Sequence, residues 1–206
     1  MDSIFENIIK NNIDFCKNGK VASYIPELAK SNPKDLGVYL VTLDGKEYYA
    51  GDYDKKFTMQ SVSKILSLML SLMDNGEAVF EKIGMEPTGD SFNSIVNLEL
   101  KSLHKPFNPM INAGAIAATA MIRGKNKDEK INRILDLAKK LSDNQNIKIN
   151  ENVYHSERIT GDRNRSLAYF MKSYNLIEGN VEDELDVYFM QCSIDVTCKD
   201  IANMGC

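Results

Sequence analysis

One β-hairpin signal followed by helical patterns to the last residue constrains this fold most. Two β-rich segments, Gly37 to Leu43 and Lys46 to Ala50, flank Asp44-Gly45, a dipeptide typical of a two-residue turn. A lone hairpin is marginal in water and needs further strands or a covering helix. Because no second strand pair is evident, we expect the strands that complete the sheet to lie beyond residue 206, and the chain to be a fragment.

Apolar residues at helical spacing predict the other elements. The first helix begins near Ile4 and ends near Asn18-Gly19. A second helix, Ser61 to Asn75, is apolar around most of its circumference, which predicts burial on all sides. Polar loops, among them residues 156–164, join the further helices that we expect at residues 78–83, 113–122, 127–141, 165–173, 182–192 and from 196 onward.

The composition is that of an ordinary globular protein and excludes several classes of partner. With 43% hydrophobic and 26% charged residues, the 206-residue chain can bury a substantial core as one domain, with room for two lobes. Its net charge of -4 gives no basic surface for nucleic acid or an anionic membrane. The N-terminus lacks a signal-peptide pattern, and the longest apolar stretch, Ile65 to Met73, is too short to span a bilayer. We therefore expect a cytoplasmic protein.

The cysteines and histidines do not form a metal-binding pattern. The chain has only two histidines, His104 and His155, and we assign neither a role. None of the cysteines forms a C-x-x-C pair, so we expect free thiols in a reducing compartment and no structural zinc. The cysteines are Cys16, Cys192, Cys198 and Cys206.

A serine and a lysine three residues apart can form an activated nucleophile. The pattern S-x-x-K occurs at Ser31–Lys34, Ser61–Lys64 and Ser102–Lys105, but proline in or beside the first and third predicts loops there. Only Ser61 begins a helix, where positions i and i+3 share a face. A buried lysine with a lowered pKa can take the proton of a serine hydroxyl. The alternative is a helix-capping serine and a solvated lysine.

Several segments together resemble the serine-dependent glutaminases, which have a β-lactamase/transpeptidase-like fold. The most specific are the stretches Asn-Pro-Met-Ile-Asn-Ala-Gly-Ala and Ser-Glu-Arg-x-x-Gly-Asp-Arg-Asn. Their order and spacing agree with the family over most of the chain. The segments are Ala22 to Ala29, Gln60 to Lys64, His104 to Ile116, Ser156 to Asn164 and Tyr188 to Ser193.

The resemblance implies an α+β fold with an active site between two lobes. Residues 1–60 would begin the α/β lobe and residues 61–206 would form the helical lobe, while the C-terminal completion of the α/β lobe is absent from this chain. The implied reaction is hydrolysis of L-glutamine to L-glutamate and ammonia through a γ-glutamyl-seryl intermediate, without metal or organic cofactor. The family also implies a homodimer or homotetramer.

The resemblance assigns a role to each matching residue. Ser61 would be the nucleophile, Lys64 the base and Tyr24 an active-site tyrosine. The matching substrate-binding residues are Ser61, Asn112, Glu157, Asn164 and Tyr188. A carboxylate suits the α-ammonium of glutamine, whereas amides and a phenol suit its carboxylate or amide oxygen. The backbone N–H of Ser61 would supply one oxyanion-hole donor. In the family, a later segment supplies the second donor and a further tyrosine, and the 206 residues stop before both. We therefore expect these residues alone to have little activity.

Each assigned residue also has a structural alternative. Asn112 and Asn164 suit helix N-caps, and Glu157 suits a solvated loop. Tyr188 suits a core position and Tyr24 an anchor for the connector before the hairpin. Two rival functions remain: another Ser-Lys acyl hydrolase of the same fold, such as a β-lactamase or penicillin-binding protein, and a non-catalytic binding module.

Overall fold

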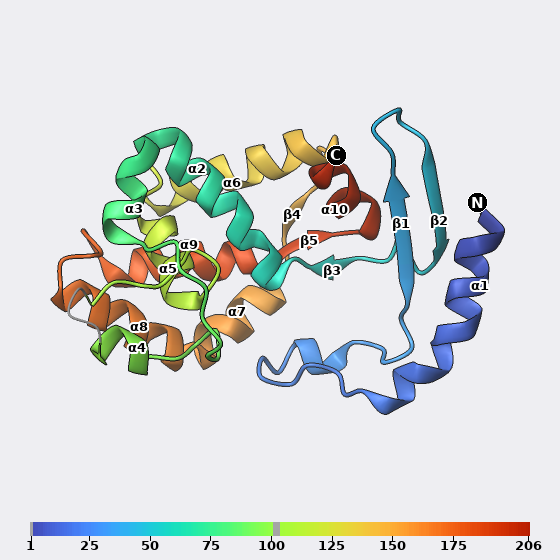
Figure 1. Cartoon of the computed structure of the whole chain (residues 1–206), viewed down its shortest axis with the longest axis horizontal. Coiled ribbons are helices and arrows are strands. Elements are labelled where there is room, and N and C mark those ends of the chain that lie inside the picture. The colour runs from blue at the N-terminus through green and yellow to red at the C-terminus, as the bar shows by residue number, and fades with distance from the viewer. Residues whose placement is uncertain (1, 101–103) are drawn as a thin grey trace. The chain divides into compact units, whose positions relative to one another are not determined.

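The computed structural model describes residues 2–100 and 104–206, which form two compact units (Figure 1). Unit 1 comprises Met1–Met59, Asp136–Thr160 and Ser193–Cys206. Unit 2 comprises Gln60–Leu135 and Gly161–Cys192. The chain thus leaves unit 1 directly before Gln60, but residues 136–160 and 193–206, which the sequence analysis placed in the helical lobe, pack with the N-terminal residues.

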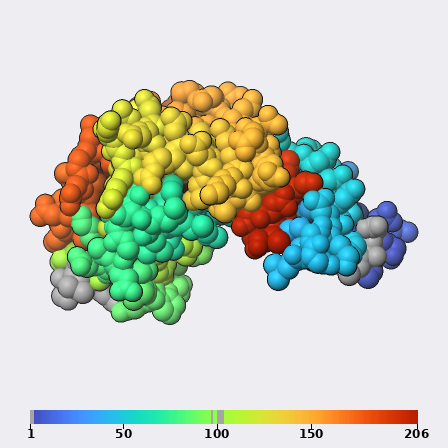
Figure 2. All heavy atoms as spheres, turned by 90° about the horizontal axis from the view of Figure 1, so that it is seen from above, coloured from blue at the N-terminus to red at the C-terminus, as the bar shows by residue number. Residues whose placement is uncertain are grey.

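The predicted hairpin in unit 1 is covered by helices from both ends of the chain. Strands β1 (Gly37–Val41) and β2 (Glu47–Gly51) pair antiparallel. Helix α1 (Asp2–Asn12) packs on β2 and continues as the 3₁₀ helix η1 (Ile13–Asn18), which ends at Gly19 as predicted. Helix α10 (Cys198–Gly205) packs on β1, and Figure 2 shows these C-terminal residues in red against the blue strands. A further 3₁₀ turn, η2 (Leu28–Lys30), lies in the connector before β1.

The turn of this hairpin is one residue longer than the two-residue turn we predicted. The N–H of Thr42 donates to the carbonyl of Lys46 at 3.0 Å, and the N–H of Gly45 donates to the carbonyl of Thr42 at 2.8 Å. Gly45 has a φ of 77°. Three residues therefore form the loop, with glycine in the left-handed position that such loops require.

A second sheet in unit 1 corrects the expectation that no further strands exist. Strands β3 (Phe57–Thr58), β4 (Lys148–Ile149) and β5 (Ile194–Val196) form an antiparallel sheet in the order β3-β5-β4. Two or three residues are too few for apolar alternation to be visible in a sequence. The last helix consequently begins at Cys198, where Thr197 and Asp200 form a capping box.

Unit 2 is built around the small-residue helix α5 (Asn112–Ala120), against which α2 (Lys64–Asn75), α8 (Asp162–Ser173) and α9 (Val181–Cys192) pack. Helix α5 is almost entirely buried, because its alanines let neighbouring backbones approach closely. The predicted helices here are confirmed within a few residues. The other elements are η3 (Gln60–Ser63), η4 (Gly76–Ala78), α3 (Val79–Lys82), α4 (Val96–Leu100) and α6 (Lys127–Ser142), which passes from unit 2 into unit 1.

The prediction that α2 is buried on all sides is wrong. Ile65 and Met73 are 52% and 71% exposed, whereas Ser67 and Ser71 are fully buried. Each buried hydroxyl donates to the backbone carbonyl three residues earlier, so its proton is bonded within its own helix. Apolar content alone therefore misidentified the buried face.

Residues 156–164, expected as a polar loop, are helical. Helix α7 (Glu151–Thr160) ends one residue before α8, and Gly161 alone separates the two. The many charged residues of this stretch concealed its helical character, because one face of each helix is solvated.

Two smaller observations complete the comparison with the sequence. Ser31 follows η2 in an extended conformation, so its loop prediction is confirmed, whereas Ser102 lies outside the described residues. No helix in the described part of the chain is long and apolar enough to cross a membrane.

Candidate active site

Ser61 and Lys64 lie three residues apart where η3 leads into α2. Ser61 belongs to the 3₁₀ turn η3, and Lys64 is the first residue of α2. Residues three apart on a helix are neighbours, with Cβ atoms about 5–6 Å apart. Ser61 is exposed, whereas Lys64 is only 2% exposed. The preceding residue, Gln60, has a φ of 47°, a left-handed conformation that non-glycine residues seldom adopt. Such strain is typical of functional sites.

The Lys64 amine is held by two oxygen acceptors. Its Nζ donates to the Met110 carbonyl and to Asn112 Oδ1, each at 2.8 Å. Burial lowers the pKa of Lys64, and the neighbouring Cys192 acts in the opposite direction. A neutral amine has two N–H bonds and one lone pair, so these two acceptors leave the lone pair for a third partner. Such an arrangement suits a general base, the role predicted for Lys64 from the sequence.

Asn112 continues the contact of Lys64 to a third helix. Asn112 Nδ2 donates to Asn164 Oδ1 at 3.1 Å, which links α2, α5 and α8 through three side chains. The N-cap alternative is wrong for both asparagines. Ile111 occupies the cap of α5, and Gly161 precedes α8, so Asn112 and Asn164 lie inside their helices.

Met110 is a site component that the sequence analysis missed, because it contributes a backbone atom. The side-chain oxygen of Asn108 accepts hydrogen bonds from the N–H groups of Met110 and Ile111 at 2.9 and 3.3 Å. This Asx-type turn orients the carbonyl that receives Lys64. The Asn-Pro dipeptide before α5 is the signal that predicts such a turn.

The predicted Tyr188 lies in α9, the helix that packs against η3. Its side chain is almost fully buried and its ring lies 6.0 Å from that of Phe189. One turn later, the Cys192 carbonyl accepts a hydrogen bond from Gln60 Nε2 at 3.3 Å. Tyr188 is thus buried on a helix that contacts the Ser61 turn, and its binding role stays a prediction.

Tyr24 and Glu157 belong to unit 1, where they lie on neighbouring segments. The N–H of Glu27 donates to Ser156 Oγ at 3.2 Å, which fixes the segment after Tyr24 on α7. Tyr24 is 68% exposed, although Ile25 beside it is buried. Glu157 is helical and 7% exposed, so the alternative of a solvated loop charge is wrong.

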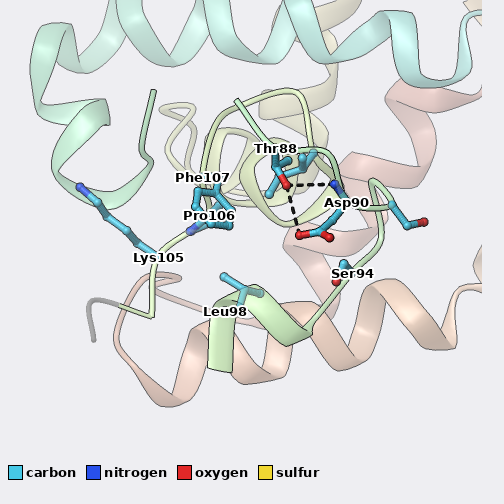
Figure 3. Close-up of a pocket in the computed structure, with 9 residues that line it drawn as sticks. Thr88, Asp90, Ser94, Leu98, Lys105, Pro106 and Phe107 are labelled. Carbon is cyan, nitrogen blue, oxygen red and sulfur yellow. Dashed lines mark hydrogen bonds between the residues drawn. The ribbon is translucent and has the colours of Figure 1, made fainter. Parts of the chain in front are cut away.

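The loop before α4 reaches Lys64 through Phe92. The Phe92 ring centroid lies 5.3 Å from Lys64 Nζ, and the Phe92 carbonyl accepts from the N–H of Asn112 at 2.8 Å. Residues of this loop help to line a cavity of about 10 Å³, and Figure 3 shows the lining residues with the Thr88–Asp90 hydrogen bonds. This volume admits at most one water molecule, so the cavity is no substrate pocket.

Comparison with known proteins identifies the family of this chain. A family model described as glutaminase matches residues 19–206. The chain belongs to the glutaminase family. It is 58% identical to glutaminase 2 of Clostridium perfringens over 206 residues, which are 100% of this chain and 68% of that protein.

Solved glutaminase structures have the same fold. The probable glutaminase of Bacillus subtilis superposes with a TM-score of 0.90 at 36% identity, covering 99% of this chain and 62% of that chain. A covalent complex of a B. subtilis glutaminase with 5-oxo-L-norleucine, formed with 6-diazo-5-oxo-L-norleucine, gives 0.87 at 35% identity over 99% and 64%. The predicted α+β, β-lactamase-like fold is therefore confirmed, and the family is one of amide hydrolases. The chain spans about two thirds of these relatives' length.

The described residues show no assembled metal site. No three histidine, cysteine, aspartate or glutamate side chains among them are grouped so that they could hold a metal ion.

Proposed function

We propose that this protein is a glutaminase, an amidohydrolase that converts L-glutamine to L-glutamate and ammonia with Ser61 as nucleophile. The observation that carries the proposal is the buried Lys64 amine, held by two acceptors and three residues after the exposed Ser61. Family membership selects glutamine as the amide.

In the first half-reaction, Lys64 acts as base and then as acid. The neutral amine takes the proton of Ser61 Oγ while that oxygen bonds to the side-chain carbonyl carbon of glutamine. The C–N bond of the tetrahedral intermediate then breaks. The Lys64 ammonium gives its proton to the leaving nitrogen, which departs as ammonia and leaves a γ-glutamyl ester on Ser61.

In the second half-reaction, water replaces the serine. Lys64 takes a proton from water as the water oxygen bonds to the ester carbon. The bond to Ser61 Oγ breaks, and the proton returns from Lys64 to that oxygen, which restores the enzyme and releases glutamate. In each half-reaction the backbone N–H of Ser61 would donate to the oxyanion.

The remaining predicted residues would recognise the amino-acid end of glutamine. Asn112 and Asn164 carry amide N–H donors, and Tyr188 carries a hydroxyl, all suited to a carboxylate or an amide oxygen. Glu157 would accept from the α-ammonium. Tyr24 would serve as the active-site tyrosine that the family pattern assigns.

The reactive ligand of the B. subtilis relative supports this covalent route. 5-Oxo-L-norleucine has its ketone at carbon 5, the position at which glutamine has its side-chain amide carbonyl. A glutaminase that forms a covalent complex with this compound therefore has a nucleophile close to that carbon. We propose that Ser61 is this nucleophile in the present chain.

The test is ammonia release from glutamine by the protein produced from its whole reading frame. Ser61→Ala and Lys64→Met should each abolish turnover, because one removes the nucleophile and the other the base. Ser31→Ala and Lys34→Met remove the other S-x-x-K pair in the described residues and should leave the rate unchanged. Retained turnover in Ser61→Ala would refute the nucleophile assignment, and hydrolysis of a chromogenic β-lactam instead of glutamine would support the rival acyl hydrolase.

The family pattern also carries two proposals about the whole protein. We expect a homodimer or homotetramer located in the cytoplasm. Sedimentation equilibrium measures the first, and fractionation of cells that produce the protein measures the second.

A further inference from the structure

The end of α9 contacts the segment from Gln60 to Ser67, which contains Ser61 and Lys64, at three places within unit 2. Gln60 Nε2 donates to the Cys192 carbonyl at 3.3 Å. The Ser63 hydroxyl donates to the Gln60 carbonyl at 2.7 Å and lies 3.9 Å from Cys192 Sγ. Gln191 Nε2 donates to Ser67 Oγ at 3.4 Å. Two consecutive residues of one helix thus fix both ends of this segment.

Gln191 is the centre of a buried polar chain that joins three helices. Its Oε1 accepts from Thr119 Oγ1 of α5 at 3.1 Å, while its Nε2 reaches Ser67 of α2. Ser67 Oγ in turn donates to the carbonyl of Lys64 at 3.1 Å. All three polar side chains are fully buried. The chain therefore ends on the backbone of the candidate base.

Such a network is poorly explained by stability alone. Apolar residues of the same size would fill this core without the cost of removing polar groups from water. Unlike apolar packing, a hydrogen bond is directional. It therefore fixes both the translation of one helix along its axis and its rotation about that axis, relative to a neighbouring helix. In this protein the network fixes the position of the first turn of α2, which follows shortly after the strained residue Gln60.

We propose that Gln191 and Cys192 are positioning residues that hold the first turn of α2 so that Ser61 stays in line with Lys64. This inference rests on the proposed function, since it takes Ser61 and Lys64 as the reacting pair. Neither residue touches the substrate in this scheme. Both act through the backbone of the turn.

Loss of the Gln191 contacts should change the environment of Lys64. Without them the first turn of α2 can rotate and Gln60 can relax toward an ordinary conformation. Water then reaches the Lys64 amine, and its pKa rises toward that of an exposed lysine. The amine also moves out of line with Ser61, which lowers kcat more than it changes KM.

The first experiment compares two serine variants of the same helix. Ser67→Ala breaks the link from Gln191 to Lys64, whereas Ser71→Ala removes an equally buried hydroxyl that bonds only its own helix. Titration of the Lys64 ε-carbon by NMR should show a pKa increase of about half a unit or more in Ser67→Ala and none in Ser71→Ala. Equal shifts in both variants would overturn the proposal.

The second experiment separates positioning from folding. Gln191→Met should raise the Lys64 pKa, lower kcat about tenfold or more and lower the melting temperature, because Thr119 and Ser67 each lose one of their two hydrogen bonds. The triple change Ser67→Ala, Thr119→Val, Gln191→Met leaves no unsatisfied group, so the melting temperature should recover. The Lys64 pKa should stay raised. Recovery of both would show a purely structural role and overturn the proposal.

A third variant addresses Cys192. Cys192→Ala removes the sulfur that lies beside Ser63 and should likewise lower kcat with little change in KM, whereas wild-type kcat would remove Cys192 from the proposal. The NMR titration needs no turnover. An unchanged Lys64 pKa in Ser67→Ala and Gln191→Met would therefore contradict the positioning role, even if the enzyme is active. Absence of glutamine hydrolysis by the unmodified protein would contradict only the proposed function.

Discussion

Lys64 is the residue on which the candidate chemistry depends most. A lysine can serve as base only when its environment favours the neutral amine, and the burial of Lys64 has that effect. Its two acceptors match the two N–H bonds of the neutral form. Both acceptors that the described residues provide for the amine are neutral groups.

The lowered pKa of Lys64 determines the pH dependence of the reaction. Because the base must be unprotonated, kcat/KM should rise with pH and level off above the pKa of Lys64 in the free enzyme. Since burial lowers that pKa, the plateau should begin below the ordinary lysine range. Stopped assays of ammonia release measure this profile across about pH 6–10. The protein must stay folded over that range. A rise centred at an exposed-lysine pKa would contradict the assignment.

Asn112→Asp should move this profile to higher pH. The new carboxylate would lie beside Lys64 Nζ, and an opposite charge at hydrogen-bond distance favours the ammonium. We expect an increase of about one unit or more in the Lys64 pKa, and slower turnover at neutral pH. Asn164→Asp is the matched control, because that residue reaches Lys64 only through Asn112. An equal shift in the two variants would argue against the direct Asn112 contact.

Among the elements of unit 2, α6 and α9 are joined by a buried ion pair. Lys130 Nζ lies 2.7 Å from both carboxylate oxygens of Glu184 and donates to the Ala120 carbonyl at 2.9 Å. Lys130→Met should cost about 3–5 kcal/mol of unfolding free energy, because it leaves a buried carboxylate without its counter-charge. Lys82→Met, which breaks the more exposed pair with Glu178, should cost about 1 kcal/mol or less. Urea unfolding measures both, and equal losses would show that burial does not determine the cost.

Helix α5 approaches the preceding turn so closely that only glycine fits at position 114. A Cβ on Gly114 would lie 1.9 Å from the carbonyl oxygen of Asn108, the residue whose side chain orients Met110. Gly114→Ala should therefore cost about 2 kcal/mol or more and also lower activity. Gly205→Ala in α10 meets nothing within 4 Å and should be neutral or slightly stabilising. A neutral Gly114→Ala in thermal unfolding would contradict this close approach.

Whether an element was predictable from the sequence depended on its length and pattern. Helices such as α1 and α9 show several turns of periodic apolar residues, so the sequence located them well. Strands β3 to β5 have no more than three residues each, and α7 is too polar for its period to be visible. Ser61, Lys64 and Asn112 were predicted as site residues from motifs, whereas the Met110 carbonyl and the Gln191 contacts depend on tertiary packing.

At the scale of the whole molecule, the two units do not follow chain order. Segments far apart in sequence, such as α1 and α10, cover the same hairpin of unit 1, while unit 2 is formed by residues on both sides of α7. Local patterns identify helices but not their partners, because contacts between distant segments leave no periodic trace. The boundary that we predicted between residues 60 and 61 was based only on the change from a hairpin to a long helix.

The length of the chain gives a prediction at this scale as well. The 206 residues span 68% of the C. perfringens relative, and the only oxyanion donor that we assign within them is the N–H of Ser61. Because one missing donor typically costs about 10²–10³ in rate, the purified 206-residue chain should release ammonia far more slowly than that relative. Comparable kcat values in one assay would show that these residues contain the full catalytic apparatus.

Covalent labelling tests the central claim, that Ser61 is the nucleophile, most directly. The protein produced from its whole reading frame is incubated with 6-diazo-5-oxo-L-norleucine, digested and analysed by mass spectrometry, with Ser61→Ala in parallel. We predict a single adduct on Ser61 that is absent from the variant. An adduct on another residue, or an unchanged adduct in Ser61→Ala, would contradict the assignment of Ser61 and with it the role of Lys64.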